Sequence, residues 1–398
     1  MTTAAAYPSA ALDAPERGRA PLFKQLRRAY GFDEVAIVPG EVTINPELVE
    51  LGLDIGGHSF RIPFLASAMD AVVDPTFAVE MHKAGGLAVL NLEGVWARYA
   101  DPRPILQQVA AASRDEATAI LQAAYQQPVR DEFVAMRIKE MKAGGAIAAV
   151  ALTPVNTKAL APLIQEAGAD LLVVQSTVTT ARHESNSIEG LRFDKLLKHI
   201  RIPVIVGNTV GFTATLELMQ TGVAAVLVGV GPGAACTSRE VLGIGVPQVT
   251  ATIDCAAARD YYFEETGRYV PIITDGGIRT GGDVCKCIVA GADGVMMGSP
   301  FAATTEAPGR GYHWGMATPH ANLPRGVRVQ VGVNTTLNKL LYGPTSRTDG
   351  TENLVGALRT AMGMCGAHTT REFQQAEMVI APAIKTEGKI YQFAQAKE

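Results

Sequence analysis

Eight short, apolar, β-prone runs recur along the chain, and most of them end in glycine, asparagine or serine before a segment with helical spacing begins. The runs are IPFLAS ending at Ser67, LAVLNL at Leu92, AIAAVAL at Leu152, LLVVQS at Ser176, PVIVGN at Asn208, AVLVGVG at Gly231, PIITDGG at Gly277 and GVMMGS at Ser299. Runs that are apolar on both faces are typical of parallel strands covered by helices. Eight such units over roughly 250 residues predict an α/β protein with a single (β/α)8 barrel.

Glycines mark the expected helix ends in MHKAGG, IQEAGAD, MQTGVAA and IVAGADG, each shortly before the next strand. The interval 96–145 is longer than one crossover needs, and its three- and four-residue apolar spacing predicts a helical insertion. Residues 1–25 are rich in alanine and proline, which predicts a disordered segment before a catalytic barrel over 26–398. Residues 312–332, rich in glycine and aromatic side chains, predict a short flap.

Composition argues against several classes of partner. The net charge is −4 with no block of like charge, so we expect neither nucleic acid nor a membrane surface as partner, and a small molecule instead. Five unevenly spaced cysteines fit a reducing cytoplasm rather than a disulfide framework. Cys285 and Cys287 are two apart in a predicted helix, where their side chains diverge, so we do not expect a zinc site.

The segment GVGPGAACTSR places one cysteine, Cys236, in a glycine-rich loop after the sixth strand. A free cysteine is most often a small buried hydrophobe. At a barrel mouth, however, backbone amides and a nearby arginine favour a nucleophile. Gly229, Gly231 and Ala234 also satisfy a dinucleotide fingerprint with Asp254 twenty residues on, but Pro232 and later glycines interrupt the helix that this fingerprint requires.

The seventh and eighth strands end in DGGI, from Asp275 to Ile278, and in Gly298–Ser299. Barrels usually bind phosphate at this place, through backbone amides. Asp275 offers two acceptor oxygens for the two hydroxyls of a ribose. Together the two motifs predict a site for a phosphorylated ribose.

These residues resemble a family, that of IMP dehydrogenase and GMP reductase, from about Tyr30 to Ala367. The motifs that carry the resemblance are RRAYGFDEVAIVPG, ASAMDAVV, VGNTV, GVGPGAACTSR, the run DGGIRTGGDVCKCIVAGADGVMMGSPFAATTEAPG and WGMAT. The resemblance implies that Cys236 attacks purine C2 and that a hydride passes between this carbon and a nicotinamide.

The resemblance also implies the other site residues. The expected nucleotide-binding positions are Ser67, Met69, Asp275, Gly277, Gly298, Ser299, Gly315 and Met316, with Tyr312 or His313 as the aromatic residue near the phosphate. The expected positions for the NAD cofactor are Gln175, Ser176, Asn208, Gly229 and Gly231. Carbonyls of Gly231, Gly233 and Cys236 match the family's potassium loop.

The chain departs from the family pattern in several places. The regulatory Bateman (CBS) module is missing, and the helical insertion occupies its place. Ala234 replaces a hydroxyl that contacts phosphate, and Gln175 replaces an aspartate on the cofactor side. The flap is too short for the usual arginine–tyrosine pair. Ser238 and Arg325 replace a catalytic threonine and its glutamate, and an arginine, which stays protonated, is a poor base.

The activity that the resemblance favours is the oxidation of IMP to XMP with NAD⁺ and water, a step of purine and GMP biosynthesis. Two alternatives stay open: a GMP reductase that uses NADPH and releases ammonia, and a purine-nucleotide-binding regulator with little turnover. Relatives form homotetramers, so we expect one here, while a further assembly into an octamer is left open by the sequence.

Overall fold

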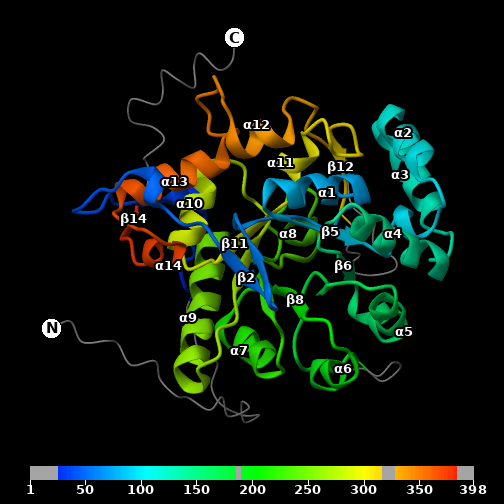
Figure 1. Ribbon diagram of the computed structural model, residues 1–398, viewed down its shortest axis with the longest axis horizontal. Helices are drawn as coiled ribbons and strands as arrows, with labels where there is room; N and C mark the ends of the chain where they lie inside the picture. Colours follow the sequence, from blue (N-terminus) through cyan, green and yellow to red (C-terminus); the bar gives the residue numbers. More distant parts are fainter. Residues whose placement is uncertain (1–25, 185–189, 316–327, 383–398) are drawn as a thin grey trace.

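The structure is a computed structural model, and it describes residues 26–184, 190–315 and 328–382. Eight parallel strands close into a barrel in the order β10-β11-β4-β5-β6-β7-β8-β9, as predicted (Figure 1). The strands are β4 (Phe64–Ala66), β5 (Leu87–Asn91), β6 (Ala149–Leu152), β7 (Leu171–Gln175), β8 (Val204–Thr209), β9 (Ala225–Val228), β10 (Ile272–Asp275) and β11 (Gly294–Met297). Seven of the eight predicted runs contain one of these strands in full, and β8 extends one residue beyond its run, to Thr209.

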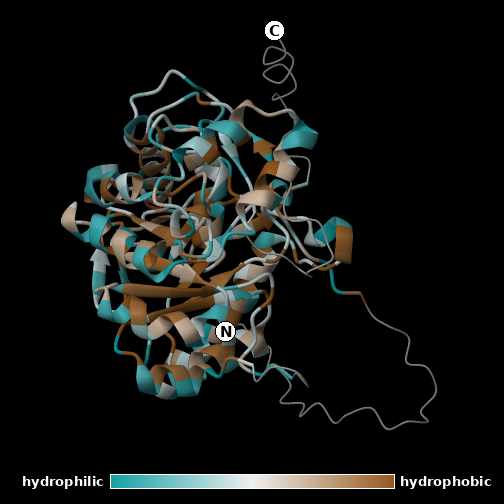
Figure 2. Ribbon diagram, turned by 90° about the vertical axis from the view of Figure 1, so that its right-hand side faces the viewer, coloured by the Kyte–Doolittle hydropathy of each residue, from teal (hydrophilic) through white to brown (hydrophobic). Residues whose placement is uncertain are grey.

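The strands are apolar on both faces because each face lies in a core. One face points into the barrel, where side chains such as Leu65, Val89 and Met296 form a closed inner cluster. The other face packs against the surrounding helices in a second, larger cluster. The long strand arrows at the centre of Figure 2 are accordingly brown, at the hydrophobic end of the scale.

A hairpin closes the amino-terminal end of the barrel. It consists of β2 (Leu53–Ile55) and β3 (His58–Phe60), which pair antiparallel. Leu53, Ile55 and Phe60 are buried in the inner cluster together with the barrel side chains. The opposite, carboxyl-terminal end is therefore the one that carries the mouth.

Helices follow most of the strands and surround the barrel. They are α1 (Pro75–Ala84), α5 (Pro154–Glu166), α6 (Phe193–His199), α7 (Phe212–Gln220), α8 (Ser238–Leu242), α9 (Gln248–Thr266), α10 (Gly281–Val289), α11 (Ser299–Ala302), α12 (Leu337–Tyr342), α13 (Leu354–Met364) and α14 (Thr370–Phe373). The glycines expected to end α1, α5, α7 and α10 have positive φ angles, at Gly85, Gly168, Gly222 and Gly291. Among the described residues, no helix is long and apolar enough to cross a membrane.

The interval between β5 and β6 holds three α-helices, α2 (Arg103–Ala111), α3 (Arg114–Ala124) and α4 (Asp131–Ala143). α4 packs against α1 and α5, in the position of a normal crossover helix. α2 and α3 pack on each other and lie outside α4, at one side of the barrel (Figure 1). We call α2, α3 and the turn to Arg130 the outer insertion.

Besides the β2–β3 hairpin, two small sheets of the described residues lie outside the barrel. β1 (Val35–Ile37) pairs antiparallel with β14 (Met378–Ile380), which joins the two ends of the described chain. β12 (Tyr312–His313) pairs antiparallel with β13 (Val329–Gln330), so the two described ends of the predicted flap lie side by side. Residues 1–25 and the middle of the flap lie outside the described residues.

Candidate active site at the barrel mouth

The carboxyl ends of the strands gather most of the predicted site residues. Ser67 follows β4, Ser176 follows β7 and Asn208 lies in β8. Gly229 follows β9, Asp275 ends β10, and Gly298 and Ser299 follow β11. These residues are far apart in the sequence, and the closed barrel brings them to one rim. Met316 and Arg325 lie outside the described residues.

Asp275 is the centre of a hydrogen-bond cluster on this rim. Its Oδ2 accepts hydrogen bonds from Gln175 Nε2 and Asn208 Nδ2, each at 2.9 Å. Gln175 Nε2 also donates to Asn208 Oδ1 at 2.9 Å. Burial raises the pKa of Asp275 to about 6, and the hydrogen bonds from Asn208, Gln175 and Ser67 oppose this rise. The carboxylate is therefore mostly ionised above neutral pH and is held in one orientation.

The loop that carries Cys236 lies against the turn after Asp275. A Cβ atom added at Gly276 would be 3.3 Å from Gly233 N, and one at Gly277 would be 3.0 Å from Pro232 Cβ. Cys236 N donates to Gly233 O at 3.0 Å, and the Cys236 side chain is exposed. Its Sγ lies 3.4 Å from Ser238 Oγ. An accessible thiol with a neighbouring hydroxyl thus faces the mouth beside Asp275.

The loop does not form a dinucleotide-binding fingerprint, in agreement with the interruptions seen in the sequence. The loop belongs to the sixth barrel strand and leads into α8, which has only five residues. Asp254 lies in α9 and accepts a hydrogen bond from Arg27 at 3.0 Å. A Rossmann unit requires a long helix directly after the glycines of the fingerprint. Gly243 and Gly245 follow α8 here and prevent such a helix.

Ser299 and His313 meet on the other side of the rim. Ser299 Oγ lies 2.8 Å from His313 Nε2, and burial lowers the pKa of His313 to about 4. The imidazole is therefore neutral at pH 7, and its buried Nδ1 has no hydrogen-bond partner among the described residues. Tyr312 points elsewhere, with the Arg328 guanidinium 4.5 Å from its ring centroid. Of the two aromatic candidates, His313 is the one at Ser299.

Two glycines allow close packing around the site. A Cβ added at Gly298 would lie 2.9 Å from the Met69 sulfur, so the β11 end and the β4 loop are in contact. A Cβ at Gly315 would lie 3.2 Å from Ala235 O, which places the start of the flap against the cysteine loop. Both predicted nucleotide-binding glycines therefore lie where larger residues would push the loops apart.

Gln248 lies beneath the site in a position that the sequence did not reveal. This buried side chain at the start of α9 donates from Nε2 to Val228 O at 3.0 Å and to Asp275 O at 2.7 Å. It ties the ends of β9 and β10 together beneath the cysteine loop. Its Oε1 has no partner among the described residues. A glutamine at a helix start is usually exposed, so no pattern distinguished this one.

Nothing in the described part of the chain offers a site for a transition metal. No group of three or more His, Cys, Asp or Glu side chains among those residues could hold a metal ion. Gly231, where φ is +84°, Gly233 and Cys236 form a tight turn in which only backbone carbonyls could act as ligands. Neutral carbonyl oxygens suit a monovalent cation.

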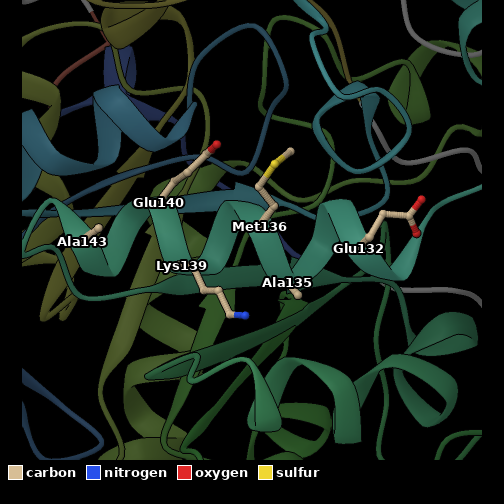
Figure 3. A pocket seen from close by; sticks show the side chains of 6 residues that line it. All are labelled: Glu132, Ala135, Met136, Lys139, Glu140 and Ala143. Carbon is tan, nitrogen blue, oxygen red and sulfur yellow. The ribbon is translucent and has the colours of Figure 1, made fainter.

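One surface hollow lies away from the mouth, on the outer side of α4 (Figure 3). It is lined by Glu132, Ala135, Met136, Lys139, Glu140 and Ala143. All six come from one helix at three- and four-residue spacing, so the hollow follows the side of α4. It contains none of the predicted site residues.

Comparison with known proteins agrees with this arrangement. A sequence model described as "IMP dehydrogenase / GMP reductase domain" matches residues 29–389. An uncharacterized oxidoreductase of Mycolicibacterium smegmatis is 39% identical over 89% of this chain and 97% of its own length. The inosine-5'-monophosphate dehydrogenase of Cryptosporidium parvum is 28% identical over 88% of this chain and 91% of its own.

A solved structure leads to the same assignment. The crystal structure of an IMP dehydrogenase/GMP reductase-like protein from Corynebacterium glutamicum superposes with a TM-score of 0.85 at 36% identity. The match covers 90% of this chain and 96% of that one. With the barrel, the rim residues and the family match in agreement, this chain is an oxidoreductase-family protein that belongs to the IMP dehydrogenase / GMP reductase family.

Proposed function

We propose that this protein oxidises IMP to XMP with NAD⁺ through a covalent intermediate on Cys236. The observation that carries the proposal is the position of Cys236: it is the one cysteine of the five that is exposed, and its loop packs on the turn after Asp275. In the first step the Cys236 thiolate bonds to purine C2, and the hydride on C2 passes to NAD⁺. Water then adds to C2, the C–S bond breaks, and XMP, one proton and the Cys236 thiolate are released.

Asp275 would bind the ribose of the nucleotide. A carboxylate has two oxygens that accept the hydrogens of two neighbouring hydroxyls. Gln175 and Asn208 already hold Oδ2 at 2.9 Å, so the group is oriented before the nucleotide arrives. Such preorganisation lowers the entropic cost of binding.

Ser299 and His313 would bind the phosphate with hydrogen bonds rather than charge. Because the imidazole is neutral at pH 7, its Nε2 can accept from the Ser299 hydroxyl while Nδ1 donates. Backbone amides near Gly277 and Gly298 would supply further donors. With these donors for the phosphate, the site would not need the hydroxyl that the family has in place of Ala234.

Water activation is the half-reaction that departs most from the family. Ser238 Oγ lies 3.4 Å from Cys236 Sγ, the sulfur of the C–S bond that must break. We propose that Ser238 orients the attacking water and that Arg325 supports its deprotonation electrostatically. As a permanently charged group, Arg325 would stabilise hydroxide without accepting the proton itself.

The cofactor side of the rim is neutral and polar. Ser176 Oγ lies 2.8 Å from Thr179 Oγ1, and Asn208 and Gln175 add two amides. These groups fit the carboxamide and ribose of a nicotinamide nucleotide, which accepts the hydride when bound. The carbonyls of Gly231, Gly233 and Cys236 would hold potassium, and we propose a homotetramer as the working assembly.

The test is absorbance at 340 nm with purified protein, in potassium buffer, run with IMP and NAD⁺ and separately with GMP and NADPH. We expect a rise in the first reaction and no change in the second. Cys236→Ala should abolish the rise, whereas the matched variant Cys365→Ala, at a partly buried site outside the mouth, should keep it.

A fall in the GMP reaction would make the protein a GMP reductase. No change in absorbance in either reaction would favour a nucleotide-binding regulator. Mass spectrometry after mixing with IMP and NAD⁺ separates this last case from an enzyme that stalls before hydrolysis, because a stalled enzyme carries the nucleotide on Cys236.

A further inference from the structure

Asp70 is a fully buried carboxyl group directly after Met69, in the loop that follows β4. It accepts hydrogen bonds from Asn91 Nδ2 at 3.1 Å, from Val95 N at 2.6 Å and from Tyr125 Oη at 2.6 Å. Burial raises its pKa, and these hydrogen bonds oppose the rise. The nucleotide-binding loop is thus anchored from beneath by three different donors.

Tyr125 links this anchor to the base of the flap. Its hydroxyl donates to Asp70 and accepts a hydrogen bond from Trp314 Nε1 at 3.0 Å. The direction is fixed, because an indole N–H can only donate. Trp314 is 2% exposed and directly precedes Gly315, the residue that packs against Ala235 of the cysteine loop. One hydroxyl therefore connects the loops on two sides of the site.

Further contacts join the outer insertion, and the segment that precedes it, to the same two places. Trp96 Nε1 donates to Asp70 O at 2.9 Å, and a Cβ at Gly94 would lie 1.7 Å from Asp70 Oδ1. Arg328, beside β13, donates to Val109 O and, at 2.8 Å, to Ala112 O at the end of α2. The insertion thus contacts Trp314, which follows β12, and Arg328, which precedes β13, in agreement with its place beside β12 in Figure 1.

We infer that Tyr125, which ends α3, is a positioning residue for the nucleotide site. Its hydroxyl holds the Met69 loop and the Trp314–Gly315 segment at a fixed separation, and so places the two walls between which the nucleotide and Cys236 meet. The outer insertion is then a support of the active site rather than an appendage. The inference rests on the proposed function for the identity of the nucleotide.

The test compares Tyr125→Phe with Tyr99→Phe. Tyr99 lies just before α2, and its hydroxyl donates to Ala124 O at the end of α3, at 3.0 Å, rather than to Asp70. Each variant loses one hydroxyl, but only Tyr125→Phe leaves Asp70 short of a donor and the Trp314 indole without an acceptor. The melting temperature of both variants measures the purely structural loss.

We expect Tyr125→Phe to raise KM for IMP about tenfold, with kcat changed less than about threefold, because binding rather than chemistry loses its support. It should also raise the rate at which iodoacetamide alkylates Cys236 severalfold without any nucleotide, because Gly315 is released from the cysteine loop. Tyr99→Phe should change neither quantity.

An alkylation rate in Tyr125→Phe equal to that in Tyr99→Phe overturns the inference, whatever the turnover. If the alkylation rates differ but wild-type protein has no activity, the inference stands and the proposed function falls. If Tyr125→Phe does not fold, Trp314→Phe removes only the hydrogen bond between Trp314 and Tyr125, and the same increase in alkylation is expected.

Discussion

Asp275→Asn should stabilise the ligand-free protein at alkaline pH while it removes nucleotide binding. Burial raises the pKa of this group from 3.8 to about 6, so the folded state holds the proton more tightly than the unfolded chain does. The stability that Asp275 contributes is therefore complete below pH 3.8 and is lost as the pH rises through 6. Asparagine has no charge to bury, so the stability that it contributes does not change with pH.

The size of the effect follows from the change in pKa. One pKa unit corresponds to about 1.4 kcal/mol, which sets an upper limit of about 3 kcal/mol at pH 8. Asp275 is only partly buried at the open mouth, and solvent screening reduces this limit, so we expect about 2 kcal/mol. Because Gln175 and Asn208 donate to Oδ2, the asparagine oxygen can accept the same hydrogen bonds.

The assay is urea denaturation at pH 5 and pH 8 of wild-type protein, Asp275→Asn and Asp54→Asn. Asp54 lies on the exposed part of the β2–β3 hairpin and serves as the matched control. The difference in the free energy of unfolding between Asp275→Asn and wild type should be about 1 kcal/mol larger at pH 8 than at pH 5, in favour of the variant. A difference that stays constant with pH, or that equals that of Asp54→Asn, would refute the reasoning.

Three further predictions follow from the same geometry. Cys236→Ala should lower turnover at least about a thousandfold and leave the Kd for IMP within about threefold, since the thiol forms a bond only in the reaction; isothermal calorimetry that finds no IMP binding would contradict this. The affinity for IMP should fall about tenfold per pH unit below pH 6, as Asp275 becomes protonated; binding that is constant from pH 5 to 8 would exclude Asp275 as the ribose acceptor. Asp293→Ala should cost about 3 kcal/mol of stability, because the 1% exposed Arg259 loses the carboxylate at 2.9 Å and keeps only the half-exposed Asp260 at 3.0 Å; a melting temperature within a few degrees of wild type would disprove it.

The barrel could be predicted because its signals are local. Strands that are buried on both faces must be apolar throughout, and each of the eight runs shows this within six or seven residues. The helix ends require a positive φ that glycine adopts without strain, and this marks Gly85 and Gly291 directly in the sequence. The residues at the carboxyl ends of the strands then had to lie on one rim, because all strands of a parallel barrel run in the same direction.

The side-chain network around Tyr125 could not be predicted in the same way. Its hydroxyl joins Asp70, 55 residues away, to Trp314, 189 residues away. No periodicity connects three such positions, and a tyrosine near the end of an amphipathic helix is ordinary. The sequence also could not decide between Tyr312 and His313. Neighbouring residues of a strand point to opposite faces, so only one of the two can face Ser299. The pairing of β12 with β13 determines that this residue is His313.

The outer insertion has a consequence for how this protein can be observed. The chain contains two tryptophans, Trp96 and Trp314, and both indole N–H groups donate into the junction between the insertion and the site loops. All tryptophan fluorescence of the protein therefore originates at this junction. A stopped-flow fluorimeter could follow the junction during a single turnover, in real time and without any attached label.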